Sequence, residues 1–169
     1  MRKLVVYSSR TGNTKMIAEA VAEALAPCDL YPVAEAPDTS AYDFVTVGYW
    51  VDKGMPDTDC RKYMETVRDK KVALFGTLGV DPSHGHAKEC ACKGEELMRA
   101  NNNTVYGTVL SQGKIDPKII EVMKKTAQDV HPMTPERIAR IEAAKSHPNG
   151  EDCRRAKDAF VEFLAAATA

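Results

Sequence analysis

The segment Ser8-Ser9-Arg10-Thr11-Gly12-Asn13-Thr14 lies between an apolar run, Lys3 to Ser8, and a stretch of helical periodicity, Asn13 to Leu25. The apolar run is nearly continuous, which is typical of a strand buried on both faces. In the following stretch the apolar residues recur at helical spacing and stop before Pro27. The quoted segment is therefore predicted to be the turn between the first strand and the first helix, and it opens a βαβ unit.

The same alternation of strand and helix continues along the first two thirds of the chain. Further strands are predicted at Asp29 to Val33, Phe44 to Gly48, Val72 to Phe75 and Thr104 to Leu110, and further helices at Asp59 to Arg68 and Ala87 to Ala100. Short connections between such elements indicate an α/β fold around a parallel sheet. Right-handed crossovers then place helices on both faces of the sheet.

The last third of the chain is predicted to be helical, with helices at Pro117 to Val130, Thr134 to Lys145 and Glu151 to Ala167. Thr134-Pro135 is a good helix start, because a capping hydroxyl precedes a proline at the first helical position. A five-stranded doubly wound sheet needs one closing helix, so part of this region is an addition. We expect a single domain, 1–169, with a sheet core at 1–116 and a helical part at 117–169.

The residue types of the turn at 8–14 suit a phosphate group. A helix start presents unpaired backbone N–H groups and the positive end of the helix dipole. Hydroxyl side chains add donors without bulk, and Gly12 allows close backbone approach. Arg10 either adds a charge-assisted bond or points to solvent. A polar turn with a good cap is the plainer interpretation. Neither the Walker pattern nor the three-glycine dinucleotide fingerprint is present.

Composition narrows the function classes. The 169 residues carry 23 Lys and Arg against 24 Asp and Glu, so nothing favours a nucleic-acid partner. No stretch approaches the roughly 18 apolar residues that span a bilayer, and an odd number of cysteines, five, suggests no disulfide framework. We expect a cytoplasmic protein that binds neither nucleic acid nor membrane. The close spacing of His84, His86, Cys90 and Cys92 does not match a zinc site, so no metal is expected.

The run Val5-Val6-Tyr7-Ser8-Ser9-Arg10-Thr11-Gly12-Asn13-Thr14 resembles the FMN phosphate loop of the flavodoxin family, whose core is Thr-Gly-Asn-Thr. Two further segments resemble that family's second and third flavin loops by their position after a strand, Gly48 to Asp57 and Ala73 to Gly79. The resemblance extends to about Asp116. It implies a flavodoxin-like doubly wound sheet of order 2-1-3-4-5, with FMN as cofactor.

The resemblance also implies which residues bind the cofactor. They belong to the three loops, and they are Ser8, Ser9, Arg10, Thr11, Gly12, Asn13, Thr14, Tyr49, Trp50, Val51, Asp52, Lys53, Gly54, Thr77, Leu78 and Gly79. No catalytic side chain is expected, since no paired-carboxylate or Ser-His-Asp arrangement can be assembled and the hard chemistry would belong to the cofactor.

Trp50, the single Trp, stands where a family member stacks an aromatic ring on the flavin. The chain departs from the family in two ways. Thr77 to Ser83 offers no second aromatic, so the other flavin face stays open or is covered by Tyr49, His84 or a partner, and the chain is not strongly acidic. A cation at Lys53 would stabilise a reduced, anionic flavin and raise the potential of the second electron; a solvated surface lysine is the alternative.

By resemblance, the function is that of an electron carrier between a donor reductase and an acceptor oxidoreductase. Two alternatives stay open. One is an FMN enzyme that reduces a quinone or similar acceptor at the expense of NAD(P)H. The other is a non-redox accessory protein that docks on a partner enzyme through its helical C-terminal part.

Overall fold

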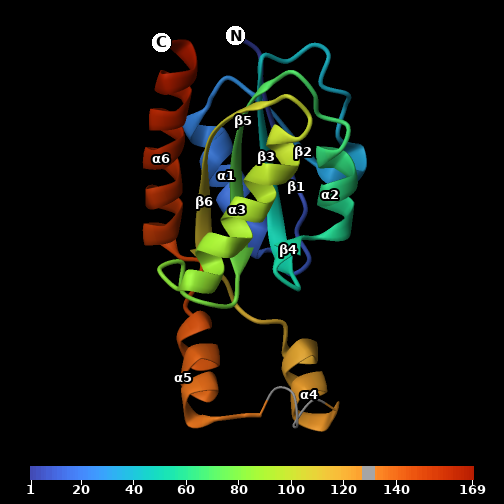
Figure 1. Ribbon diagram of the computed structural model, residues 1–169. Helices are drawn as coiled ribbons and strands as arrows, with labels where there is room; N and C mark the ends of the chain where they lie inside the picture. Colours follow the sequence, from blue (N-terminus) through green and yellow to red (C-terminus); the bar gives the residue numbers. More distant parts are fainter. Residues whose placement is uncertain (127–131) are drawn as a thin grey trace.

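A parallel sheet of strand order β2-β1-β3-β5-β6 forms the centre of the molecule (Figure 1). The computed structural model describes residues 1–126 and 132–169. The strands are β1 (Lys3–Tyr7), β2 (Asp29–Pro32), β3 (Phe44–Asp52), β5 (Lys71–Leu78) and β6 (Thr104–Gln112), with a two-residue β4 (Met55–Pro56) paired antiparallel to the end of β3. Counted over the five long strands, the order is the predicted 2-1-3-4-5. The short strand β4 was not predicted.

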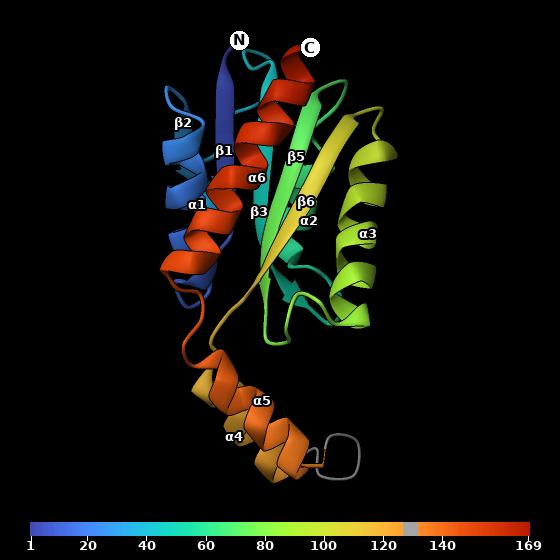
Figure 2. The same cartoon turned by 90° about the vertical axis from the view of Figure 1, so that its left-hand side faces the viewer.

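Helices cover both faces of this sheet (Figure 2). The helical elements of the chain are α1 (Asn13–Ala24), a 3-10 turn η1 (Val33–Glu35), α2 (Thr58–Met64), α3 (Gly85–Arg99), α4 (Pro117–Thr126), α5 (Pro135–Ala144) and α6 (Gly150–Thr168). The α1 and α6 helices lie side by side on one face, and α2 and α3 lie on the other (Figure 2). The fold is therefore the three-layer α/β arrangement that the strand–helix alternation predicts.

The structure corrects two strand ends. β3 was expected to end at Gly48 and runs to Asp52, and β5 was expected to end at Phe75 and runs to Leu78. Their extensions pair with each other in register, Tyr49 with Gly76 and Trp50 with Thr77. Ladder hydrogen bonds thus continue into stretches that family resemblance treats as loops. Helix α2 is shorter than predicted, since it ends at Met64.

The helical last third divides into two parts. Helix α6 returns to the sheet and is the closing helix, whereas α4 and α5 form a hairpin that extends beyond one end of the sheet (Figures 1 and 2). Thr134 caps α5 as predicted, its hydroxyl accepting the backbone N–H of Arg137 at 3.2 Å. The predicted helix end at Val130 lies outside the described residues. No helix in the described ranges is long and apolar enough to cross a membrane.

Two apolar cores lie on the two sides of the sheet. The larger one joins β1, β3 and β5 to α2 and α3, and the other joins the opposite strand faces to α1 and α6. In the second core the fully buried Phe160 of α6 contacts Phe75 of β5 edge-on, with ring centroids 6.0 Å apart, and Phe163 at 5.3 Å. Aromatic pairs of this geometry favour one fixed position of α6 against the sheet.

Replacing Phe160 with Ala should destabilise the protein by about 3–5 kcal/mol, because it removes a buried aromatic side chain and leaves a cavity. Chemical denaturation followed by circular dichroism measures the change. The adjacent Val161 is 53% exposed, so Val161→Ala is a matched control that should alter the unfolding free energy by less than about 0.5 kcal/mol. Equal decreases in the unfolding free energy of the two variants would contradict the packing of α6 on the sheet through Phe160.

Candidate functional site

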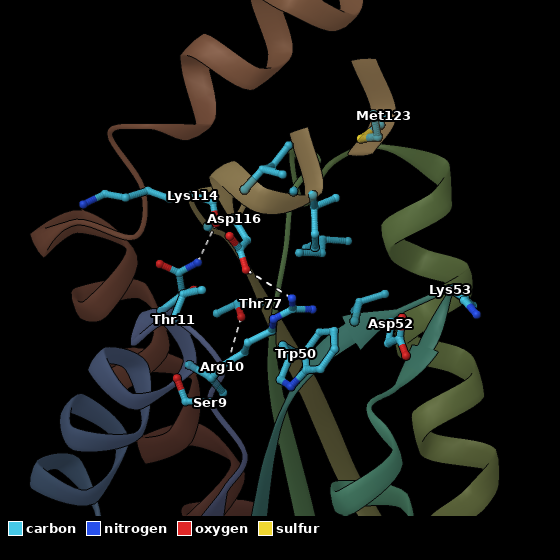
Figure 3. A pocket seen from close by; sticks show the side chains of 18 residues that line it. Ser9, Arg10, Thr11, Trp50, Asp52, Lys53, Thr77, Lys114, Asp116 and Met123 are labelled. Carbon is cyan, nitrogen blue, oxygen red and sulfur yellow. Dashed lines mark hydrogen bonds and ion pairs between the residues drawn. The ribbon is translucent and has the colours of Figure 1, made fainter. Parts of the chain in front are cut away.

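A cavity of about 360 Å³ opens at the carboxyl ends of β1, β3 and β5 (Figure 3). This is the point where the strand order reverses between β1 and β3, which is where doubly wound folds bind ligands. The volume lies within the ordinary range for small-molecule sites. The lining residues are Ser9, Arg10, Thr11, Asn13, Thr14, Trp50, Val51, Asp52, Lys53, Thr77, Leu78, Gly79, Gly113, Lys114, Ile115, Asp116, Ile119 and Met123.

The turn before α1 forms one end of this cavity. The Ser9 hydroxyl oxygen accepts the backbone N–H groups of Gly12 and Lys15, at 3.1 and 3.2 Å, and so caps the start of the helix. Gly12 has a φ of 96°, a left-handed conformation that suits glycine. The Thr11 hydroxyl is exposed, and no hydrogen bond within the described residues uses it. The turn thus keeps a free hydroxyl beside a helix start.

Ser8 has a different role from its neighbours. It is buried, and its hydroxyl donates to Oδ1 of Asp57 at 2.8 Å. A hydroxyl has one proton to donate, so Ser8 holds the turn in place and its proton is not available to a ligand. Of the predicted cofactor-binding residues, Ser8, Gly12, Tyr49 and Gly54 do not line the cavity.

Arg10 neither points into free solvent nor forms part of an open anion cradle. Its guanidinium pairs with Oδ2 of Asp116 at 3.2 Å, and its Cζ lies 5.7 Å from the ring centroid of Trp50. Figure 3 shows this side chain inside the ring of lining residues, between the Trp50 ring and the Asp116 carboxylate. The distance to the ring is within cation–π range. Arg10 therefore links the turn to both neighbouring parts of the site.

The second predicted loop is the end of a hairpin. Trp50, Val51 and Asp52 belong to β3, and the turn to β4 is made by Lys53 and Gly54, which have φ values of 50° and 79°. Trp50 is half-buried and faces the cavity. In Figure 3 the exposed Lys53 side chain points away from Trp50. The Lys53 ammonium therefore lies at the rim of the cavity.

Tyr49 and His84 do not reach the cavity. Tyr49 is fully buried under α3, where its hydroxyl lies 2.8 Å from the position that a Cβ on Gly94 would take. Burial raises its pKa well above the ordinary value. His84 is exposed and caps α3 by accepting the His86 backbone N–H. Neither residue lines the cavity, so an open face and a face covered by a partner are the alternatives that remain for the second side of the flavin.

Sequence reasoning missed the side of the cavity formed by the end of β6 and the start of α4. Asp116 accepts the Lys118 N–H at 2.9 Å and starts α4, and Asn13 donates to the Lys114 carbonyl oxygen at 2.9 Å across the cavity mouth. The missed lining residues are Gly113, Lys114, Ile115, Asp116, Ile119 and Met123. Their one sequence signal is Asp116-Pro117, a cap before a proline at the first helical position.

The residues present fit a flat ring that carries a phosphate. Exposed backbone and the free Thr11 hydroxyl lie at the α1 start, where anions bind, and Trp50 with Leu78, Ile115 and Ile119 supplies an aromatic and apolar wall. Thr14 and Thr77, both buried, share a hydrogen bond of 2.8 Å between these two parts. Within the described ranges no three potential metal ligands gather, although His86 Nε2 lies 3.6 Å from Cys90 Sγ.

Comparisons with known proteins agree with this geometry. A family model described as "Flavodoxin domain" matches residues 4–161. The chain is 33% identical over 161 residues to the flavodoxin-like domain-containing protein BilS of Clostridioides difficile (strain CD3), covering 90% of each chain. It is 25% identical over 190 residues to BilS of Clostridium symbiosum (strain WAL-14163), covering 97% of this chain and 94% of that one.

Among solved structures, oxidised Flavodoxin 1 from Bacillus cereus superposes with a TM-score of 0.63 over 98% of both chains, at 14% identity. At this identity the likeness shows the fold alone.

Asp57, beneath the turn, gives the site a measurable pH signature. Burial raises the pKa of its carboxyl group, against the lowering effect of hydrogen bonds from Ser8 and the backbone. The folded state therefore holds this proton to a higher pH than the unfolded state, so Asp57 costs stability as the pH rises from its ordinary value through the raised one.

The free energy of unfolding of Asp57→Asn, relative to that of the native protein, should therefore rise as the pH rises from the ordinary pKa of a carboxyl group through the raised pKa of Asp57. Urea denaturation at a series of pH values measures this difference. A difference that stays constant or falls with rising pH would contradict the raised pKa of Asp57.

Proposed function

This chain belongs to the flavodoxin domain family, and from that premise we propose that it binds FMN in the cavity at the end of β1, β3 and β5 and carries electrons between partner proteins. The observation that carries the proposal is the pairing, within one cavity, of a hydroxyl-bearing helix start with a half-buried tryptophan. The first suits a phosphate dianion and the second suits a flat heteroaromatic ring.

In this proposal the protein binds and orients a cofactor that itself takes up and gives away electrons. The Thr11 hydroxyl and the backbone N–H groups at the start of α1 hold the phosphate. Trp50 packs against one face of the ring, and Ile119 and Met123 of α4 add apolar side chains to the cavity lining. A second aromatic residue is then unnecessary, because aliphatic side chains can exclude water equally well.

An electron carrier is preferred to a stand-alone enzyme for a structural reason. Helix α4 contributes Ile119 and Met123 to the cavity lining, and the α4–α5 hairpin extends beyond the end of the sheet (Figure 1), so a protein that approaches the ring edge would meet it. We infer a donor reductase and an acceptor oxidoreductase as partners. We also place the protein in the reducing cytoplasm, in keeping with five cysteines that are all free.

Titration of the purified protein with FMN, followed by flavin fluorescence and calorimetry, tests the cofactor. Saturable binding with quenched fluorescence is expected. Addition of NAD(P)H to the loaded protein then separates the roles, since a carrier stays oxidised until a reductase is added. Oxidation of NAD(P)H by the protein alone would favour the quinone-reductase alternative. A protein that takes up no FMN yet enhances a partner enzyme would favour the accessory role.

Thr11→Val keeps the shape of the side chain and removes its hydroxyl, so it should weaken FMN binding by about tenfold, the effect of losing one hydrogen bond to a charged group. Calorimetry measures the dissociation constant. Thr104→Val is the matched control at an exposed position on β6, and it should leave FMN affinity unchanged. Equal affinities of the two variants would remove Thr11 from the phosphate site.

Lys53→Ala should lower the potential of the second electron. Because Lys53 lies at the solvent-exposed rim, the shift should be on the order of 20 mV, which corresponds to roughly 0.4 kcal/mol between unit charges about 10 Å apart in water. Potentiometric titration measures it. Lys53→Arg, which keeps the charge, should retain the native potential. A potential that rises or stays constant in Lys53→Ala would mark Lys53 as a solvated surface residue.

A further inference from the structure

The Arg10 side chain contacts both the Trp50 ring and the Asp116 carboxylate. Its guanidinium lies over the Trp50 ring, at 5.7 Å from Cζ to the centroid, and holds Asp116 at 3.2 Å. Among the described residues that line the cavity, Trp50 is the single aromatic one. A ring that stacks on this face of Trp50 therefore has to displace the guanidinium from the tryptophan and loosen its bond to Asp116.

Displacement leaves two charges without partners, and an anion on the ligand can supply a new partner to one of them, the Arg10 guanidinium. The Asp116 side chain is only 14% exposed, and the Arg10 side chain is 46% exposed. A phosphate dianion is a stronger partner for guanidinium than a single carboxylate, because it carries more charge and offers several oxygens to the planar fork. Arg10 stands in the turn that forms the phosphate end of the cavity, so its reach includes that anion.

We propose that the Arg10–Asp116 pair is a specificity device that makes ring stacking on Trp50 conditional on a phosphate, and so selects the phosphorylated flavin over riboflavin. This proposal rests on the proposed function. Arg10 exchanges Asp116 for the ligand phosphate, and the exchange offsets the cost of uncovering Trp50. Riboflavin carries the same ring and no anion, so it bears the full cost of moving Arg10.

Titration of the native protein and four variants with FMN and with riboflavin tests this. In Arg10→Gln, riboflavin should bind about two- to fivefold more tightly, since the ion pair no longer has to be broken. FMN should bind more weakly, so the ratio of the two dissociation constants should fall about tenfold or more. In Asp116→Asn, riboflavin should again bind about two- to fivefold more tightly, while FMN affinity also rises.

Riboflavin is the informative probe, because it is uncharged and does not respond to a general change in the charge of the site. The matched control is Asp81→Asn, the same carboxylate-to-amide change at an exposed position outside the cavity, which should leave riboflavin affinity unchanged. The double variant Arg10→Gln/Asp116→Asn should bind riboflavin no better than Arg10→Gln alone, since one pair cannot be broken twice.

The outcomes separate the two claims. A native protein that binds FMN, with riboflavin affinity equal in the native and both single variants, overturns the specificity device and leaves the proposed function intact. Additive gains in the double variant overturn it in the same way. A native protein that takes up neither flavin overturns both proposals. The melting temperature of each variant shows whether the variant is still folded, and so whether a change in its affinity results from loss of structure.

Discussion

The parallel pairing of β1 with β3 is the constraint on which the site depends. The ladder runs from Lys3 opposite Phe44 to Tyr7 opposite Gly48, and the Ser8 N–H continues it to the Gly48 carbonyl oxygen at 2.9 Å. Because β2 pairs with the other side of β1, the strand order reverses at this point and leaves a crevice. The turn at 8–14 and Trp50 therefore emerge side by side, although they are far apart in the sequence.

Most polar side chains around this crevice are committed to the protein itself. Ser8 is bonded to Asp57, Ser9 caps α1, and Thr14 is bonded to Thr77. These bonds fix the backbone of the turn, so its N–H groups are oriented in advance of any ligand. The buried Asp57, with one carboxylate oxygen lacking a hydrogen-bond partner, is the cost of this arrangement in the described structure. The side-chain hydroxyls of Ser8, Ser9 and Thr14 thus serve mainly to fix the backbone conformation of the turn.

The sequence predicted those parts that local patterns control. The turn at 8–14, the alternation of strand and helix and the Thr134 cap follow from periodicity and residue type, and the structure confirms the family and fold. The extended ends of β3 and β5 were missed, because they depend on pairing between two strands that are distant in the chain. The position of Tyr49 under Gly94 was missed for a similar reason: an aromatic beside Trp50 alternates to the opposite face of the strand. The cavity wall from Gly113 to Met123 was missed because it depends on a long-range contact. These residues follow the last strand, β6, but they line a cavity next to the turn after the first strand, β1.

Gly113 has a wider consequence. A Cβ at this position would lie 2.7 Å from Nδ2 of Asn13 and 3.0 Å from its Cγ, and Asn13 cannot move aside without giving up its bond to the Lys114 carbonyl oxygen. A side chain at this position, where the chain leaves β6 for α4, would therefore cost the hydrogen bond between Asn13 and Lys114. The attachment of the two-helix hairpin to the sheet thus depends on the absence of a single side chain, and a substitution at Gly113 would also disturb the cavity wall that begins there.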